Sequence, residues 1–244
     1  MRKLNIAIIG LGNIGSYLFK YLRDNKKILT EKNNCLPIVK YVSAKNKKRK
    51  RNIAIKKNQW LNNYLDATKY KDVDLIVELI GGAEGAAKKL VFNALKNKKH
   101  VVTANKALIA KYGDILSKIA EKNKVNLEFE ASVCGGVPII RSLKEGLIAN
   151  KISKIYGIFN GTSNYILSSM DKENKNFDDI LKRAKILGYA ESNPSADLNG
   201  NDVASKLKIL SSLCFNSFLN DKIYVEGINQ IDKIDINNAN NLGY

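Results

Sequence analysis

The chain has 244 residues, of which 45% are hydrophobic and 26% charged, a composition that is typical of a globular protein and argues against intrinsic disorder. This length favours two modest domains over one. The net charge of +18 is compatible with a nucleic-acid-binding protein. However, the lysines are spread along the whole chain, and no zinc-finger, RNA-recognition or helix-turn-helix signature accompanies them. We therefore expect no nucleic-acid partner.

Cysteines and apolar runs indicate the compartment. The three cysteines are widely separated and show neither a C-x-x-C pattern nor metal-ligand spacing, which indicates a reducing, cytoplasmic environment. No apolar run approaches the roughly 20 residues that span a bilayer. The apolar run near the N-terminus is short and ends in glycines, so it predicts a first strand rather than a signal peptide. We therefore expect a soluble protein without a membrane partner.

The first strand leads into a glycine-rich turn. Residues 6–9 are apolar, residues 10–15 read G-L-G-N-I-G, and residues 16–22 have the pattern of an amphipathic helix. A strand, a G-x-G-x-x-G turn and a helix in this order form the dinucleotide-binding fingerprint, although any tight strand-to-helix turn can give the same glycines. Amides at the start of the helix would face the phosphates. The residues expected to bind the cofactor here are Gly10, Gly12, Asn13, Ile14 and Gly15.

A basic run follows the second predicted strand, residues 36–43. In a dinucleotide fold, an acidic residue at this strand end binds the ribose of NAD, whereas basic residues accommodate the 2′-phosphate of NADP. The run K-N-K-K-R-K-R at residues 45–51 contains no acid. It predicts that NADP(H) is preferred over NAD(H), with Lys45, Lys47 and Arg49 as the candidate phosphate ligands. The alternative is a solvated lysine-rich loop.

Alternating strands and helices continue the pattern. Strands are predicted at residues 73–80, 100–103 and 125–130, with helices that end at residue 95 and span residues 107–120. The order predicts an α/β protein with a Rossmann-type doubly wound parallel sheet. Lys106 follows the strand that ends at Thr103, where ligands bind in open parallel sheets. His100, the only histidine, precedes a buried strand, so acid chemistry would fall to a lysine or a carboxylate.

A glycine-rich elbow at residues 131–138 marks the predicted domain boundary. We expect a nucleotide-binding domain at residues 1–132 and a second domain at residues 133–244. The second domain is predicted to begin with a helix at residues 139–149 and a strand at residues 152–159. A second helix is expected to begin at residue 161 and a third to span residues 177–187, followed by a loop at residues 187–200. Asn160 before the second helix has the pattern of an N-cap, which explains the residue completely.

Three carboxylates and a lysine gather at the end of this domain. Glu191 and Asp197 lie on a loop rich in glycine and asparagine, and Asp202 and Lys206 follow it. If residues 203–213 are helical, Asp202 and Lys206 lie four residues apart on one face. They then form either a solvated ion pair or a unit that acts on a ligand. Acidic groups beside one amine suit a small substrate that resembles an amino acid.

Several motifs in chain order resemble the homoserine dehydrogenase family. They are the glycine turn, T-A-N-K-A-L-I-A at residues 103–110, E-A-S-V-C-G-G-V-P at 130–138, G-I-F-N-G-T-S-N-Y at 157–165 and the acidic loop from Gly188 to Lys206. The resemblance implies an NAD(P)-dependent oxidoreductase that interconverts L-homoserine and L-aspartate 4-semialdehyde on the route to threonine and methionine. It also implies that the second domain is an α+β substrate-binding domain through which the protein forms a homodimer.

The resemblance implies roles for individual residues. Lys206 would be the general acid, and Lys106 would contact substrate and cofactor in the same crevice. Glu191, Asp197 and Asp202 would be the carboxylates that bind the substrate. Glu191 would bind its amino end, while Asp202 would hold the substrate or orient Lys206. Thr103 and Gly188 would complete the cofactor site. A monovalent cation, Na⁺ or K⁺, would bind at the elbow, unless the elbow is only a hinge; its ligands would be Glu130, Val133, Gly135 and Val137.

The chain departs from the family at its end, because relatives normally continue beyond residue 244. The expected second domain is therefore truncated relative to the family. An inactive cofactor-binding fragment is one alternative to the enzyme, and another two-domain oxidoreductase acting on a related amino or semialdehyde substrate is a second. A basic protein that meets nucleic acid through its lysines is the third.

Overall fold

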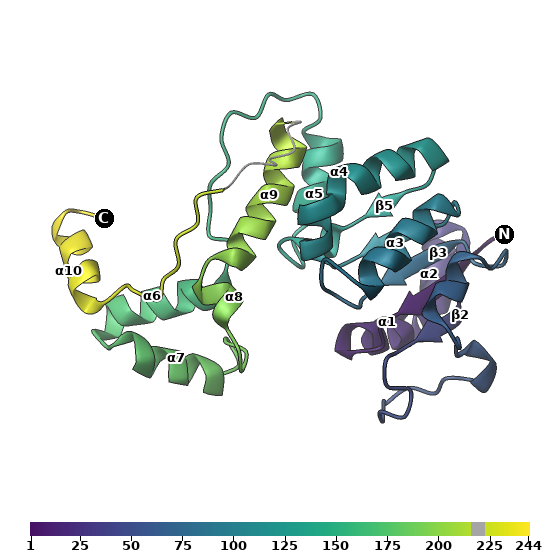
Figure 1. Ribbon diagram of the computed structural model, residues 1–244, viewed down its shortest axis with the longest axis horizontal. Helices are drawn as coiled ribbons and strands as arrows, with labels where there is room; N and C mark the ends of the chain where they lie inside the picture. The colour runs from purple at the N-terminus through teal and green to yellow at the C-terminus, as the bar shows by residue number, and fades with distance from the viewer. Residues whose placement is uncertain (216–222) are drawn as a thin grey trace. The chain divides into compact units, whose positions relative to one another are not determined.

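The computed structural model describes residues 1–215 and 223–244, which divide into two units (Figure 1). The first unit is Met1–Gly146 and the second is Leu147–Tyr244. Each unit is described by itself. The predicted boundary after residue 132 depends on the glycine-rich elbow at residues 131–138, and it stays a prediction.

A parallel sheet forms the centre of the first unit. Its strands run in the order β2-β1-β3-β4-β5, and every neighbouring pair is parallel. Their bounds are β1 Arg2–Ile9, β2 Cys35–Ser43, β3 Leu75–Glu78, β4 His100–Thr103 and β5 Leu127–Glu128. The predicted doubly wound sheet is therefore confirmed, although β3 and β5 are shorter than the sequence pattern predicts.

The strand order reverses at β1, and this reversal creates the binding crevice of such folds. The chain moves from β1 outward to β2, then returns to the other side of β1 for β3. Because crossovers between parallel strands are right-handed, connections on the two sides of the reversal cover opposite faces of the sheet. Ile9 at the end of β1 pairs with Ser43 of β2 and Glu78 of β3. The carboxyl ends of these strands therefore meet at the switch point, where ligands bind.

Helices cover the sheet in two pairs. In the first pair α1 contacts α2, and in the second α3 contacts α4. Their bounds are α1 Asn13–Asp24, α2 Lys26–Asn33, α3 Ala86–Lys96 and α4 Lys106–Asn123, and the short 3₁₀ turns η1 Lys57–Gln59 and η2 Tyr64–Thr68 lie between β2 and β3. Helix α2 was not predicted, because it buries none of its residues and so lacks a clear apolar stripe.

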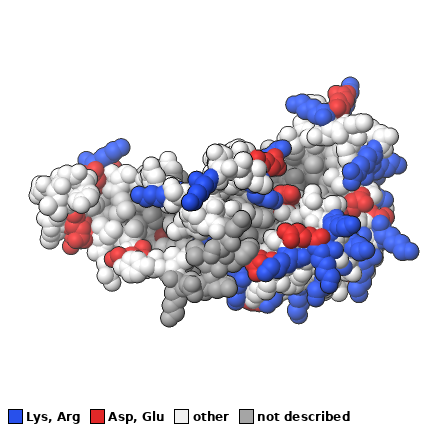
Figure 2. All heavy atoms as spheres, turned by 90° about the horizontal axis from the view of Figure 1, so that it is seen from above, with Lys and Arg blue, Asp and Glu red and all other residues white. Residues whose placement is uncertain are grey.

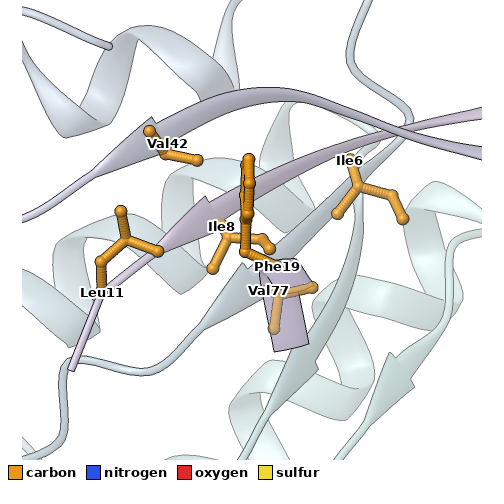
Figure 3. Packing of buried hydrophobic residues seen from close by; sticks show 6 residues of the cluster. All are labelled: Ile6, Ile8, Leu11, Phe19, Val42 and Val77. Carbon is orange, nitrogen blue, oxygen red and sulfur yellow. The ribbon is translucent and has the colours of Figure 1, made fainter. Parts of the chain in front are cut away.

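One hydrophobic cluster fixes α1 against the sheet. Phe19 of α1 packs among side chains from β1, β2 and β3 (Figure 3). Ile8 and Val42 are fully buried in this cluster. Replacing a buried side chain of this size by alanine typically costs about 2–5 kcal/mol. Helix α1 therefore holds a fixed position on the strands, and so does the turn that leads into it.

The first unit ends in short irregular helices. After β5 come η3 Glu130–Ser132, α5 Ile139–Arg141 and the π-helical turn η4 Ser142–Gly146. The predicted helix at residues 139–149 is therefore too long. Glycine favours helix termination because it loses the most conformational freedom inside a helix, and η4 ends at Gly146.

Helices build the second unit. They are α6 Gly161–Glu173, α7 Phe177–Ile186, α8 Ser195–Leu198, α9 Asn201–Phe215 and α10 Lys233–Asn241. A core cluster joins α6 and α7 to the acidic loop; it contains Ile166, Met170, Ile180, Ala184, Ala190 and Leu198. The sequence pattern predicted α6, α7 and α9 but gave no signal for α8 and α10.

The predicted strand at residues 152–159 is wrong for this structure. No strand forms among residues 147–215 and 223–244, so the strands expected of an α+β domain are not formed in the described part of this unit. A β-strand is stabilised by hydrogen bonds to a neighbouring strand, and this segment has no such neighbour among the described residues. Tyr156 and Ile158 are consequently 84% and 78% exposed.

Candidate active site

Two glycines of the first unit are required by close backbone approaches. Gly10 has φ +110°, and a Cβ there would lie 2.4 Å from the carbonyl oxygen of Leu79. A Cβ on Gly15 would lie 2.1 Å from the carbonyl oxygen of Gly10. Any other residue at these positions would push β1, α1 and the end of β3 apart. The two glycines therefore bring the first turn of α1 to the switch point of the sheet.

Gly12 differs from these two glycines because the space beside it is open. A Cβ on Gly12 would meet no atom within 4 Å, and the residue is the N-cap of α1. Within the described ranges, no side chain caps this helix, and Asn13 and Ile14 are exposed. The amides of a helix N-terminus attract anions. Open space beside uncapped amides fits a dinucleotide pyrophosphate.

The basic run forms a loop that is tied to the glycine turn. The amide of Gly10 donates to the carbonyl of Ser43 at 2.9 Å, so the end of β2 lies beside this turn. Arg51 then donates through Nε to the carbonyl of Leu11 at 2.9 Å. Its guanidinium also donates to carbonyls within the loop itself, those of Asn46, Lys47 and Arg49.

Arg51 therefore folds the basic loop over the edge of the glycine turn. Burial of its guanidinium lowers the pKa of Arg51, and Arg49 adds to this effect, although an arginine stays protonated at neutral pH. The predicted phosphate ligands, Lys45, Lys47 and Arg49, all remain exposed. Their charges are thus available to a ligand at the end of β2.

A buried polar network lies across the ends of β3 and β4. Glu78 is fully buried and accepts hydrogen bonds from the amides of Ile80 and Gly81, at 2.7 and 3.0 Å. The hydroxyl of Thr103 donates to the second carboxylate oxygen of Glu78 at 2.5 Å and accepts from the amide of Asn105. The only proton of that hydroxyl is therefore used within the protein. Any contact from Thr103 to a cofactor would have to use another of its atoms or the oxygen lone pairs.

Asn105 continues this network and places Lys106. Its side chain caps α4 by accepting from the amide of Leu108 at 3.1 Å, and it donates to the carbonyl of Gly82 at 2.7 Å. Lys106 is the next residue and the first of α4. The network thus fixes the backbone of Lys106 at the carboxyl edge of the sheet, as the sequence pattern predicts.

The second unit brings a lysine and a carboxylate together. Lys206 and Asp202 lie on α9, and the ammonium Nζ is 2.7 Å from the carboxylate of Asp202. The two side chains are 18% and 4% exposed, which excludes the solvated version of this pair. Nζ also donates to the carbonyl of Phe159 at 2.7 Å. An ammonium has three N–H donors, so one remains without a partner among the described residues.

A second carboxylate joins this pair through Asn160. The amide Nδ2 of Asn160 donates to Asp197 at 2.7 Å and to Asp202 at 3.0 Å. Of the predicted cluster, the structure brings Asp197, Asp202 and Lys206 together around Asn160. Glu191 is exposed on the same loop, and Gly188 lies just after α7 with φ +80°. Their binding roles stay predictions.

The elbow closes on itself through Glu130. Its two carboxylate oxygens accept from the amides of Ile140 and Arg141, at 3.0 and 2.9 Å. The carbonyl of Val137 accepts from the amide of Ile139 at 2.8 Å. Val133 is buried and Gly135 exposed. Residues 1–215 and 223–244 contain no group of three or more His, Cys, Asp or Glu side chains that could hold a metal ion, so a cation here would need main-chain oxygens beside the carboxylate of Glu130.

Comparisons with known proteins agree with this geometry. Two family models match, "Homoserine dehydrogenase, NAD binding domain" over residues 10–130 and "Homoserine dehydrogenase" over residues 138–244. A homoserine dehydrogenase structure from Thiobacillus denitrificans is 40% identical with a TM-score of 0.90, covering 100% of this chain and 56% of that one. A proposed homoserine dehydrogenase from Archaeoglobus fulgidus is 30% identical with a TM-score of 0.83, covering 99% of this chain and 78% of that one. The chain belongs to the homoserine dehydrogenase family.

The chain aligns with only part of the length of its curated relatives in the homoserine dehydrogenase family. The enzyme of Neisseria gonorrhoeae is 42% identical over 245 residues, an alignment that covers 100% of this chain but 56% of that enzyme. The chain therefore spans about half the length of the curated relatives it matches. None of the helices within residues 1–215 and 223–244 combines the length and the hydrophobicity that a membrane-spanning helix requires.

The sequence alone did not predict the roles of three residues in the candidate site of this homoserine dehydrogenase family member. Arg51 was grouped with the basic run, and only the structure shows that it organises the run. Glu78 gave one signal, a single acid at the end of an apolar strand. Asn160 was interpreted only as an N-cap; its side chain does accept from the amide of Ser163, but it also holds two carboxylates.

Proposed function

We propose that the chain catalyses the homoserine dehydrogenase reaction, the interconversion of L-homoserine and L-aspartate 4-semialdehyde with NADP(H). The observation that carries the proposal is the buried Lys206–Asp202 pair, in which one of the three ammonium N–H groups has no partner among the described residues. The proposal also draws on the family to which the chain belongs.

Lys206 is the general acid in this proposal. Reduction of the aldehyde needs a proton, or a strong hydrogen bond, at the oxygen that develops negative charge. The third N–H of Lys206 supplies it, while Asp202 and the carbonyl of Phe159 fix the direction of the ammonium. In the reverse direction the same nitrogen accepts the hydroxyl proton. The nicotinamide, when bound, supplies or accepts the hydride.

The acidic groups bind the substrate. L-Aspartate 4-semialdehyde and L-homoserine carry an ammonium group, which carboxylates recognise through charge-assisted hydrogen bonds. We assign this recognition to Glu191, Asp197 and Asp202. Lys106, at the edge of the sheet, is assigned to contact substrate and cofactor.

The cofactor is proposed to be NADP(H) in preference to NAD(H). The glycine turn and the amides of Asn13 and Ile14 suit the pyrophosphate, and the exposed side chains of Lys45, Lys47 and Arg49 suit the 2′-phosphate. Thr103 and Gly188 complete the assigned cofactor contacts. A kcat/KM for NADH equal to that for NADPH would contradict the phosphate assignment.

The first test is turnover by the purified chain. We expect it to oxidise NADPH when L-aspartate 4-semialdehyde is added, and Lys206→Met to lower kcat by about 10²- to 10⁴-fold, as is typical for loss of a general acid. Lys208→Met, on the same helix, is the matched control and should leave kcat close to that of the parent chain. A kcat for Lys206→Met within a few-fold of the parent would remove Lys206 from this role.

Two other results would point to the alternatives. NADPH binding without turnover, measured by fluorescence of the reduced cofactor, would support a chain that binds the cofactor but does not catalyse. Turnover of a related semialdehyde in place of L-aspartate 4-semialdehyde would support a different two-domain oxidoreductase. Both outcomes leave the family membership unchanged, because it depends on sequence and fold.

We further propose a cytoplasmic homodimer on the route to threonine and methionine, with Na⁺ or K⁺ at the elbow. Support for the compartment comes from Cys35, Cys134 and Cys214, none of which forms a disulfide. Glu130 and the carbonyls of Val133, Gly135 and Val137 are the assigned cation ligands. Equal activity in sodium, potassium and choline salts would contradict the cation, and a monomer in sedimentation would contradict the dimer.

A further inference from the structure

Two carboxylates of the second unit lie unusually close to one amide. Asp197 Oδ1 is 2.7 Å and Asp202 Oδ2 is 3.0 Å from the same nitrogen, Nδ2 of Asn160. Like charges held this near to each other repel in a buried site. Lys206 compensates one of them through its 2.7 Å contact with Asp202. The two N–H bonds that the Asn160 amide directs at the pair add to this compensation.

The orientation of the Asn160 amide is fixed by chemistry. Asn160 is 7% exposed, and its Oδ1 accepts from the amide of Ser163 at 2.8 Å as the N-cap of α6. The opposite side of the group faces only carboxylate oxygens, which accept and do not donate, so Nδ2 must lie there. Asn160 therefore uses its acceptor for the helix and both donors for the site.

The first turn of α6 is bound to the acidic loop at further points. The hydroxyl of Thr162 donates to the carbonyl of Tyr189 at 2.6 Å, and the hydroxyl of Ser163 donates to the carbonyl of Asp197 at 3.1 Å. Phe159, the residue before Asn160, supplies the carbonyl that holds Lys206. Four residues between positions 159 and 163 thus position both the loop and the lysine, and Asn160 is the one that contacts the two carboxylates.

We propose that Asn160 is a positioning residue: its amide holds Asp197 and Asp202 at the spacing that a substrate ammonium needs, and through Asp202 it directs Lys206. This inference deepens the proposed function and rests on it for the identity of the substrate. Among the residues that commonly cap helices, only asparagine meets this demand. Aspartate and serine can cap a helix, but neither offers two N–H donors on the same group as the capping oxygen.

Two substitutions separate the capping role from the positioning role. Asn160→Asp keeps the shape and the capping oxygen but replaces the donors by a third negative charge beside Asp197, Asp202 and Lys206. Asn160→Ser keeps a capping oxygen and adds no charge. The matched control is Asn63→Asp, because Asn63 caps η2 by accepting from the amide of Leu65 and lies in an exposed position without these carboxylates.

The first readout is the melting temperature as a function of pH, which needs no turnover. At about pH 8 we expect Asn160→Asp to melt roughly 5 °C or more below the parent chain. The clustered carboxyl groups of the folded variant should bind protons more tightly than those of the unfolded chain. The decrease in melting temperature should therefore become smaller as the pH falls toward about 4, because a protonated carboxyl can donate a hydrogen bond in place of the amide. Asn160→Ser should show a loss that changes little with pH, and Asn63→Asp almost none.

The second readout is rescue by exchange of partners. In the double variant Asn160→Asp with Asp197→Asn, the amide at position 197 can donate to the carboxylate at position 160, so the hydrogen bond is restored in the opposite direction. We therefore expect the double variant to regain most of the melting temperature that Asn160→Asp loses at about pH 8. Its KM for the semialdehyde should stay raised by about tenfold or more, because a substrate carboxylate is lost. The raised KM depends on the proposed function, whereas the recovery of stability does not.

Three outcomes would overturn the positioning role. They are an Asn160→Asp variant as stable as the parent at about pH 8, a loss that is the same at every pH, and a double variant no more stable than Asn160→Asp alone. If no variant or parent shows turnover, the proposed function fails while the melting data still decide the role of Asn160. If Asn160→Asp does not fold at about pH 8, the double variant and the acidic samples carry the test.

Discussion

At the scale of single residues, the glycines of the first turn have separable roles. Gly15 has no room for a side chain, because a Cβ would lie 2.1 Å from the carbonyl oxygen of Gly10. Gly12 has room in the protein itself, with ordinary backbone angles of φ −77° and ψ −156°, and its open space is where a pyrophosphate would lie. The pattern G-x-G-x-x-G therefore combines a glycine required by the fold with one required by the ligand.

This difference predicts two distinct variants. Gly12→Ala should leave the melting temperature within about 2 °C of the parent chain but weaken NADPH binding by roughly tenfold or more, because the methyl group occupies the pyrophosphate space. Gly15→Ala should lower the melting temperature as well, since α1 must move away from β1 and β3. Thermal melts and a cofactor titration measure both effects. Unchanged NADPH affinity for Gly12→Ala would contradict the assignment of the turn to the cofactor.

Local spacing predicts some site residues and not others. The Asp202–Lys206 contact is four residues apart on one helix, so the sequence was sufficient. The contact from Asn160 to Asp202 joins residues 42 apart, and the contact from Arg51 to Leu11 joins residues 40 apart. Such contacts depend on how loops and helices pack, which no periodicity in the chain reports. An Asn before a helix predicts a cap, and nothing local distinguishes a cap that also holds two carboxylates.

At the scale of elements, an exposed carboxylate joins α3 to α4. Glu84, in the loop before α3, contacts Lys111 of α4 at 2.7 Å and Lys88 of α3 at 3.1 Å, and it also accepts from the hydroxyl of Tyr112. These partners, with Lys111 the largest contributor, lower the pKa of Glu84 from 4.5 to about 2. A carboxyl whose pKa is lower in the folded chain stabilises it above the unfolded pKa, and this contribution is lost as the pH falls through the folded pKa.

Glu84→Gln should therefore lower the melting temperature at neutral pH, and the difference from the parent should shrink as the pH falls from about 4.5 toward 2. The effect should be small and should weaken in high salt, because the group is exposed and screened. Glu121→Gln, an exposed position on α4, is the control for loss of a charge. The assignment fails if the two variants show the same dependence on pH.

The sequence predicted a strand correctly where the order of strands and helices along the chain also predicted its neighbours in the sheet. The strands of the first unit were predicted, because alternating strands and helices imply a parallel sheet that buries each strand on both faces. Residues 152–159 were also predicted to form a strand, yet they remain unpaired in the described structure. Periodicity reports the preference of a segment, whereas pairing depends on a second segment at the right place. Helix α8 is too short for any periodicity to detect.

At the scale of the whole molecule, the net charge is divided unequally between the units. Residues 1–146 contain 30 Lys and Arg against 12 Asp and Glu, whereas residues 147–244 contain 11 of each. The entire charge of +18 therefore belongs to the first unit, over which Lys and Arg gather on the face shown in Figure 2. The proposed ligands differ in the same way. NADPH carries several negative charges, but the semialdehyde carries one ammonium and one carboxylate.

The positively charged first unit attracts a negatively charged ligand, and the range of this attraction decreases as the salt concentration rises. Raising the ionic strength from about 0.1 to 1 M shortens the Debye length from roughly 10 to 3 Å, which screens this attraction. Electrostatic steering raises association rates by about 10- to 10³-fold, so we expect the KM for NADPH to rise by roughly tenfold over this range, and the KM for the semialdehyde to change little. NADH has fewer charges and should respond less than NADPH. Steady-state kinetics in sodium and potassium chloride would separate screening, which both salts share, from a requirement for one cation. Equal salt dependence for NADPH and the semialdehyde would show that the lysines of the first unit are only a solvated surface.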